Sequence, residues 1–486
     1  MCFGGGLYDA VQVRMPFSPG GRMNEATEWS IGIDFGTAFS KAACARSAVG
    51  ERASLREVFP LRIGEVGGAN RPFLAPSSIF LDRERVHFGA RAVEKLIAAR
   101  LEERELVRSF KTVLGADDFE GALNRYPRPT MDPDRMFRLR DLIILYLAYL
   151  LALVDASGLQ QFGVSGLTQR ARLRFTRPGW LPDRIAAAHE IMTGLFSQAH
   201  LVNVKLGSAL IDPAGLPYAA GRKALDEARA DPAAFSSLDG GIYEASAVGI
   251  CHYSDPHVPG LMLIVDIGGG TTDVAALVRA PFESGVNVVR AGRRTINTAG
   301  DYFDNAFIDL MTKKAKLQTD AERAALRNKV IPIVRELKED VFTKGQVQAL
   351  FRGQRIVVTA RELERNPIFK AGIAEIRTLY GECLAELAEF GRRQGVRRIG
   401  VVLAGGGAHL PAVQAMVMHK RWLGFGIKLT LLPSTPLWVQ ELETAQELDP
   451  LFSQLSAAFG AALSTREAEE PHEIRSVSDS STVMTL

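Results

Sequence analysis

Three turns in the sequence place glycines directly after a run of apolar residues, and each could bring the backbone against a charged ligand. They read IGIDFGTAFSK at 31–41, LIVDIGGGTTDV at 263–274 and VVLAGGGAHLP at 401–411. Glycine has no Cβ, so the chain can approach a ligand closely at these points. Backbone amides and hydroxyl groups in such turns donate hydrogen bonds to phosphate oxygens. The residue types therefore indicate phosphate binding.

The first turn adds an acid and a base to this pattern. Asp34 can hold Mg²⁺, directly or through its water ligands, because carboxylate oxygens are donors that this ion prefers. Gly36 permits close approach, Thr37 supplies a hydroxyl, and Lys41 can neutralise phosphate charge. A hairpin turn that carries an acid and a threonine without any ligand is the alternative interpretation.

The second turn contains three successive glycines between two apolar strands. Each glycine inside a regular element costs roughly 0.5–1 kcal/mol relative to alanine, so a plain hairpin has no use for three. The same pattern occurs at 31–45 and again at 262–278, which indicates two hairpins that face each other across one ligand. Neither turn has the spacing of the P-loop or of the dinucleotide-binding fingerprint.

The third turn joins a buried strand at 398–404 to a helix that starts at Pro411. A helix N-terminus can face an anion, and the flat surface of three glycines leaves room for a base or a ribose. A tight strand-to-helix turn without a ligand is again the alternative.

The elements that must position these turns follow from the apolar periodicity of the chain. Besides the two hairpins, strands are expected at 171–178 and 398–404. Helices are expected over 90–108, 139–156, 182–198, 301–317, 319–343, 370–393 and 455–464. This mixture of strands and helices predicts an α/β protein.

The composition excludes several classes of protein. The 486 residues carry a formal net charge of only +3, which excludes a protein built mainly to bind polyanions. The four cysteines form no CxxC pair, so a structural zinc site is not expected and the thiols read as reduced and intracellular. The apolar run Leu142–Val154 is shorter than the about 20 residues that span a bilayer. We therefore expect a buried core helix there and a cytoplasmic protein without a secretory signal.

Together the three turns resemble the phosphate-1, phosphate-2 and adenosine motifs of the actin-like ATPase superfamily, which includes actin, the DnaK-type heat-shock chaperones and the sugar kinases. The resemblance implies a two-lobed actin-like ATPase fold, in which duplicated ribonuclease-H-like domains enclose a nucleotide cleft. Further segments resemble the 70-kilodalton heat-shock branch: SFKTVLG at 109–115, YEASAV at 243–248, AGDYFDN at 299–305 and QLSAAFGAAL at 454–463.

The resemblance also implies a role for individual residues. It places the catalytic groups at Lys111, Glu244, Asp266 and Thr271, and Mg²⁺ near Asp34 and Asp266. It places ATP or ADP against Gly36, Thr37, Ala38, Lys41, Gly268, Gly269, Gly270, Thr272, Lys338, Gly405, Gly406 and Gly407. The alternatives are a solvated surface lysine at Lys111, a helix-capping carboxylate at Glu244, and helix N-caps at Asp301 and Asp304.

The sequence departs from the heat-shock pattern in three places. Lys41 follows Asp34 by seven residues, as in actin, and His409 replaces the arginine that normally lies near the adenine. After residue 463 no apolar linker and no peptide-binding domain are expected. The expected organisation is a flexible leader at 1–28, lobe I at 29–258 with an insertion at about 205–240, lobe II at 259–464 with a nucleoside-binding subdomain, and a flexible tail at 465–486.

These features favour a DnaK-like ATPase that binds Mg-ATP, hydrolyses it slowly and acts as a nucleotide-driven conformational switch for a protein partner. Neither nucleic acid nor a membrane is expected as a partner, and the oligomeric state is open. The alternatives are an actin-like protein that polymerises with nucleotide, a nucleotide-sensing module without turnover, and a small-molecule kinase of the same superfamily.

Overall fold

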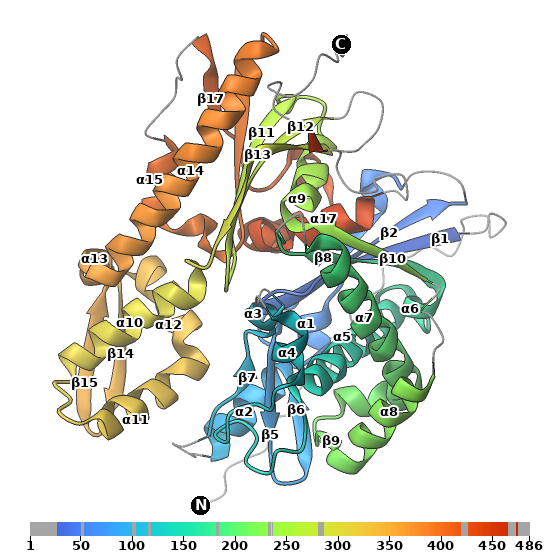
Figure 1. Cartoon of the computed structure of the whole chain (residues 1–486), viewed down its shortest axis with the longest axis vertical. Coiled ribbons are helices and arrows are strands. Elements are labelled where there is room, and N and C mark those ends of the chain that lie inside the picture. Colours follow the sequence, from blue (N-terminus) through green and yellow to red (C-terminus); the bar gives the residue numbers. More distant parts are fainter. Residues whose placement is uncertain are drawn as a thin grey trace, which may run out of the picture.

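Two β-sheets with helices on their faces make up the two lobes of this computed structural model (Figure 1). The structure describes residues 27–49, 53–99, 104–114, 118–180, 184–231, 235, 237–279, 286–418, 426–464 and 473–474. Almost all of the expected leader (1–28) and tail (465–486) lies outside these described residues.

The sheet of lobe I runs in the order β10-β8-β1-β2-β3, and β4 pairs with β2. Strand β1 is antiparallel to β2 and parallel to β8, which is in turn parallel to β10. The strands are β1 Thr27–Asp34, β2 Phe39–Ala48, β3 Val58–Pro60, β4 Ala75–Pro76, β8 Ala171–Arg177 and β10 Leu238–Tyr243.

The sheet of lobe II repeats this arrangement in the order β13-β12-β11-β16-β17, with the short strand β18 at the β13 edge. Strand β11 is antiparallel to β12 and parallel to β16, and β16 is parallel to β17. The strands are β11 Leu261–Ile267, β12 Thr272–Arg279, β13 Val286–Ile296, β16 Arg398–Ala404, β17 Lys428–Leu431 and β18 Glu473–Ile474. The same strand order and the same senses in both lobes confirm the expected duplication.

Each sheet is covered on one face by long helices of its own lobe. Helices α5 (Leu139–Phe162) and α7 (Ile185–Leu206) cover the sheet of lobe I, and α14 (Pro367–Arg393) covers the sheet of lobe II. Helix α5 is long and apolar enough to cross a membrane, but 83% of its most apolar window is buried inside the fold. It is therefore the core helix that the sequence predicts.

The other face of each sheet is covered by a helix from the opposite half of the chain. Helix α9 (Glu244–Tyr253) follows the last strand of lobe I, but its apolar side packs on β11, β12 and β16 of lobe II. Helix α17 (Phe452–Leu463) is the last helix in the described part of lobe II, and it packs on β1 and β2 of lobe I. The two helices also contact each other, so they join the lobes behind the cleft.

Smaller elements complete both lobes. In lobe I, β5 (Ser78–Leu81), β6 (Arg85–Phe88), β7 (Val107–Arg108) and β9 (Leu216–Pro217) form a second sheet. The helices of this lobe are α1 Ile63–Val66, α2 Gly89–Ala99, α3 Phe110–Val113, α4 Phe119–Asn124, α6 Leu167–Arg170 and α8 Tyr218–Ala230. In lobe II the hairpin β14 (Gln346–Phe351) and β15 (Gln354–Thr359) lies beside α10 Gly300–Lys314, α11 Asp320–Val330, α12 Val334–Lys344 and α13 Ala360–Arg365, and α15 Pro411–Met418 and α16 Ala445–Leu448 follow.

Three expectations about elements differ from the structure. The helix expected over 90–108 is α2, which ends at Ala99, and 107–108 forms strand β7. The helix expected over 319–343 is two helices, because Pro332 lacks the amide hydrogen that a continuous helix needs there. The range 205–240, expected as a surface insertion, contributes β9 to the second sheet of lobe I and packs α8 on α7. Its described residues therefore pack against the rest of lobe I.

Candidate active site

A cavity of about 690 Å³ lies between the lobes, and residues of all three glycine turns line it. Its volume is within the range of about 300–1,000 Å³ that is usual for small-molecule sites. The predicted residues that line it are Asp34, Gly36, Thr37, Ala38, Lys41, Lys111, Glu244, Asp266, Gly268, Gly269, Gly270, Thr271, Lys338, Gly405, Gly406 and Gly407. One cavity therefore brings together predicted residues that are up to 373 positions apart, from 34 to 407.

The first and second glycine turns face each other across the cavity. A Cβ atom added to Gly269 would lie 3.1 Å from the Cβ of Ala38, so the two turns are close to van der Waals contact. The first turn is held from below by Ser77, whose hydroxyl donates to the carbonyl of Gly36 at 2.7 Å. Tyr146 of core helix α5 donates to the Ser40 hydroxyl at 3.1 Å.

The third glycine turn packs against the end of β11. Gly405 has a φ of +76°, in the left-handed region, and a Cβ there would lie 2.4 Å from the Asp266 carboxylate. Any side chain at Gly405 would therefore collide with the acid of the second turn. The turn is also hydrogen-bonded to α17, because the Gly405 amide donates to the carbonyl of Ser453 at 2.7 Å.

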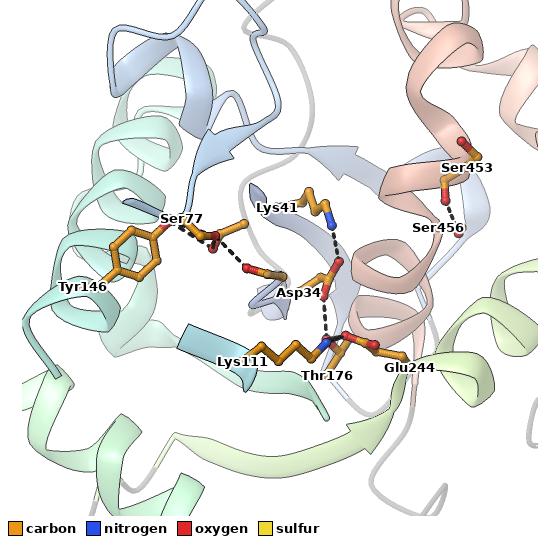
Figure 2. A network of polar contacts seen from close by, with 11 residues as sticks. Asp34, Lys41, Ser77, Lys111, Tyr146, Thr176, Glu244, Ser453 and Ser456 are labelled. Carbon is orange, nitrogen blue, oxygen red and sulfur yellow. Dashed lines mark hydrogen bonds and ion pairs between the residues drawn. The ribbon is translucent and has the colours of Figure 1, made fainter. Parts of the chain in front are cut away.

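Lobe I contributes a charged centre to the cavity, formed by the side chains of Asp34, Lys41, Lys111 and Glu244. Asp34 is the last residue of β1. Asp34 and Lys41 are directly opposite each other in the β1–β2 register. Lys41 Nζ donates to Asp34 Oδ2 at 2.7 Å, and Thr176 Oγ1 donates to Asp34 Oδ1 at 2.9 Å (Figure 2). The hairpin thus sets a basic group beside the acid, as the spacing of seven residues allows.

A second ion pair lies next to the first. Lys111 of α3 donates to Glu244, the first residue of α9, and both side chains are less than a tenth exposed. Thr176 Oγ1 is also 3.3 Å from the same carboxylate. The surface-lysine alternative for Lys111 is therefore excluded. Glu244 heads a helix as the capping alternative supposed, but its carboxylate contacts Lys111.

Two acids of lobe II face this centre. Asp266 on β11 and Asp273 on β12 are opposite each other in the register of the second hairpin. Asp273 accepts hydrogen bonds from Thr271 at 2.8 Å and from Thr295 at 2.6 Å. Asp266 has no such donor among the described side chains and lies at the cavity wall.

The pKa values in the cavity follow from burial and charge. Burial opposes ionisation of Asp34, but the charges of Lys41 and Lys111 outweigh it and lower the pKa of Asp34 below its usual value. Burial lowers the pKa of Lys111, against the opposing charges of Asp34, Asp273 and Asp266. Burial, Asp273 and Asp34 together raise the pKa of Asp266 to about 7.

These groups fit a hydrated divalent cation better than a metal cage. Burial first, and then the charges of Asp273 and Asp34, raise the pKa of Asp266, and a cation beside its carboxylate would oppose this shift. Within the described ranges, no three His, Cys, Asp or Glu side chains converge closely enough to enclose a metal. Mg²⁺ commonly keeps several waters and takes only one or two carboxylates along with phosphate oxygens. Asp34 and Asp266 are the residues that could hold it.

The far end of the cavity is built by helices α10 and α12. Lys338 donates to Asp304 at 2.6 Å and to the Gly300 carbonyl at 2.9 Å. Asp301 accepts from Arg335 at 3.0 Å and from Ser109 at 2.7 Å. The N-cap of α10 is Ala299, without a side-chain hydrogen bond. The two acids are therefore ion-pair partners, and the capping alternative for them is not what the structure has.

Thr272 and His409, both in the glycine-rich segments, differ in whether they line the cavity. Thr272, predicted to bind the cofactor, does not line the cavity: it is fully buried on β12 and its hydroxyl donates to the Thr298 carbonyl at 2.6 Å. Thr271 still belongs to the turn and lines the cavity, whereas Thr272 is the first residue of β12. His409 lines the cavity with its Nε2 3.0 Å from the Ser453 hydroxyl.

Several polar contacts beside the cavity join one lobe to the other. Arg71 of lobe I forms an ion pair with Glu339 of α12, and Ser109 reaches Asp301. Arg335 of lobe II donates to the Ala38 carbonyl at 3.2 Å. The lobes are thus held together above the ligand space as well as behind it.

Four residues at or beside the cavity were not predicted from the sequence: Thr176, Arg71, Glu339 and Gln454. The last three line the cavity, and Thr176 contacts two residues that do. Thr176 belongs to no glycine turn and is brought to Asp34 only by the pairing of β1 with β8. To predict Thr176 from the sequence, one would need the pairing register of β1 and β8, which are about 140 residues apart.

Comparisons with known proteins match part of the chain. A family model described as MreB/Mbl protein matches residues 244–429. The chain is also similar to a protein named "Chaperone protein HscA homolog" from Aeromonas hydrophila subsp. hydrophila, at 27% identity over 176 residues. That alignment covers 36% of this chain and 27% of the relative, so the chain matches about a quarter of that protein's length.

Both matches support a place in the actin-like ATPase superfamily. The two lobes with repeated strand order and the cavity between them have the architecture of the actin-like ATPase fold. The fold expected from the three glycine turns is therefore confirmed. Membership of the heat-shock branch in particular stays a prediction.

Proposed function

We propose that the chain binds ATP with Mg²⁺ in the cavity between the lobes and hydrolyses the ATP slowly. The observation that carries the proposal is the convergence of two facing glycine turns with the Lys111–Glu244 pair and the acids Asp34 and Asp266. Hydrolysis of a phosphoanhydride depends mainly on positioning and charge neutralisation, and the cavity contains residues suited to both.

Different groups in the cavity would bind the phosphates, the metal ion and the nucleoside and would promote the hydrolysis. Amides of 36–38 and 268–271 would bind the phosphates, Asp34 and Asp266 would hold the hydrated ion, and Lys338 with 405–407 would hold the nucleoside. Bound Mg²⁺ supplies neutralisation of the phosphate charge. Lys111 would add positive charge at the terminal phosphate, and Glu244 would accept a hydrogen bond from the attacking water and orient it. Thr271, hydrogen-bonded to Asp273, would donate from the opposite wall.

We further infer that nucleotide state changes the relative position of the lobes and so the surface that a protein partner meets. Hinge closure around a ligand is a common form of switching. The cross-cleft contacts of Arg71, Ser109 and Arg335 support this proposal, because separation of the lobes would have to break all three. The partner stays unidentified.

The test is ATP hydrolysis by the purified chain with Mg²⁺, beside the variants Lys111→Ala and Asp266→Ala. The matched control is Lys370→Ala, since Lys370 is exposed on α14 away from the cavity. Slow turnover that is lost in the first two variants and kept in the control is the expected result. Tight binding of ATP without turnover would make the chain a nucleotide-sensing module, and absence of binding would overturn the proposal.

A second candidate is nucleotide-dependent polymerisation, and the match of the MreB/Mbl model to 244–429 is the observation that favours it. Sedimentation and light scattering with Mg-ATP and with Mg-ADP would test it. Growth of scattering with ATP above a critical protein concentration would support a polymer. A sedimentation coefficient that stays that of one copy at all concentrations would exclude it.

A further inference from the structure

We propose that Thr176 is a positioning residue for the hydrolysis, which holds the metal-side acid Asp34 and the water-orienting acid Glu244 at a fixed separation. The inference rests on the proposed function. Thr176 Oγ1 lies 2.9 Å from Asp34 Oδ1 and 3.3 Å from Glu244 Oε1, and the side chain is 1% exposed (Figure 2). One hydroxyl therefore bridges two acids that belong to different elements.

The backbone fixes this hydroxyl in place. Strand β8 lies between β1 and β10, with Phe175 opposite Ile33 and Thr176 opposite Ile242. Asp34 follows Ile33 directly, and Glu244 follows the end of β10, so the pairing carries all three groups to the same edge of the sheet. A threonine in a strand is also restricted about χ1, which limits the positions that its hydroxyl can take.

The two acids that Thr176 contacts differ in the other hydrogen-bond donors that would remain beside them during the reaction. A hydroxyl has one hydrogen to donate, so Thr176 can donate to only one of the two carboxylates at a time, and its shorter contact is the 2.9 Å one to Asp34. Asp34 has a second donor in Lys41, and Glu244 has a second donor in Lys111. In the proposed reaction Lys111 must turn toward the terminal phosphate, and Glu244 then loses that donor. Among the described residues, Thr176 is the donor that stays beside Glu244 to keep it oriented.

This role predicts a specific kinetic signature. Thr176→Val keeps the shape of the side chain and removes the hydroxyl, so Glu244 should lose its orientation while the nucleotide-binding turns are unchanged. We expect the single-turnover hydrolysis rate to fall by roughly 10- to 100-fold, because misplacement of a reacting group by about 1 Å can cost that much. The Kd for ATP should change by less than about threefold, and Thr176→Ser should restore most of the rate.

The matched control is Thr168→Val. Thr168 is also a buried threonine of lobe I whose hydroxyl donates to a carboxylate, Asp155 Oδ2 at 2.9 Å, and it does not line the cavity. Its loss should lower the unfolding temperature without changing the hydrolysis rate of the folded protein. A rate loss from Thr168→Val equal to that from Thr176→Val would show a general effect on stability and would overturn the positioning role.

The experiment measures single-turnover hydrolysis of ATP, ATP affinity and thermal unfolding of each full-length variant. If the wild type hydrolyses ATP and Thr176→Val hydrolyses it at the same rate, the role of Thr176 is overturned and the proposed function stands. Absence of wild-type hydrolysis overturns both. If Thr176→Val does not fold, Thr176→Ser decides: a rate near that of the wild type supports the role, and a loss of 10-fold or more despite the retained hydroxyl overturns it.

Discussion

Arg71 of lobe I and Glu339 of lobe II form an ion pair across the cavity that both side chains line. Arg71 Nη1 lies 3.2 Å from Glu339 Oε1, and the guanidinium is 5.6 Å from the centre of the Phe39 ring. Both side chains are part-exposed, at 29% and 43%. The pair therefore lies where the cavity wall is partly exposed to solvent.

Removal of this ion pair should speed the release of nucleotide. An exposed pair of this kind is worth at most about 1 kcal/mol, so Arg71→Ala should raise the release rate of ADP by up to roughly fivefold. Stopped-flow release of a fluorescent ADP analogue measures this. Arg91→Ala is the matched control, because Arg91 and Glu94 pair on one helix of lobe I at 2.7 Å. Equal rates in both variants would contradict the prediction.

The buried pair of Lys338 and Asp304 should matter for stability as well as for the nucleoside. Asp304 is only 3% exposed and Lys338 13%. Lys338→Met leaves the Asp304 carboxylate with Arg335 at 3.9 Å as its nearest cation. We expect a loss of about 2–3 kcal/mol in the free energy of unfolding, measured by denaturant titration.

The double variant Lys338→Met with Asp304→Asn separates charge from packing. It removes the uncompensated buried charge, so it should unfold with a smaller loss than Lys338→Met alone. A double variant that is less stable than the single variant would show that packing of the lysine stem, rather than the charge, accounts for the loss.

Gly460 should tolerate no side chain where α17 crosses α9. A Cβ there would lie 1.7 Å from the carbonyl oxygen of Ala247, a backbone atom that cannot turn aside. Gly460→Ala should therefore cost about 1–3 kcal/mol in the free energy of unfolding. Gly381→Ala on α14 is the control, because a Cβ there meets nothing within 4 Å. That helix substitution should instead stabilise the protein by up to about 1 kcal/mol.

Acid should destabilise the protein through His252 on α9. Burial lowers the pKa of His252 to about 4, partly opposed by Asp255. The unfolded chain, with a histidine pKa of about 6.5, then binds more protons than the folded chain between pH 6.5 and 4. Stability from this residue is complete above pH 6.5 and is lost as the pH falls toward 4, by up to about 3 kcal/mol.

The variant His252→Gln removes the contribution of His252 to the pH dependence of stability, because glutamine does not titrate in that range. Its free energy of unfolding should fall less steeply than that of the wild type between pH 6.5 and 4.5. Parallel pH dependences in the two proteins would show that His252 is not buried in its neutral form.

The cavity could be predicted from sequence where its residues are local to a pattern. The glycine turns at 31–41, 263–274 and 401–411 carry their ligand chemistry within a few residues, and all three line the cavity. Thr272, predicted to bind the nucleotide, is the first residue of β12 and does not line the cavity, and the pattern of residue types does not show where that strand begins. Lys111 and Glu244 were found by resemblance, and the structure places them in contact.

The groups that join distant segments could not be predicted in the same way. Thr176 reaches Asp34 through the pairing of strands β1 and β8, and Arg71 reaches Glu339 only when the lobes come together. Both depend on long-range register, which hydrophobic periodicity does not encode. The two-lobed fold itself was predicted from the resemblance of the glycine turns to the actin-like ATPase superfamily, and the repeated hairpin pattern indicated two hairpins that face one ligand.

The exchange of α9 and α17 between the lobes determines how the molecule should unfold. Neither half of the chain can bury its own sheet, because the helix that covers one face of each sheet comes from the other half. The boundary between the lobes is therefore not a boundary between two folding units. Calorimetry should show one cooperative transition for the lobes, even though the proposed switch moves them as two bodies.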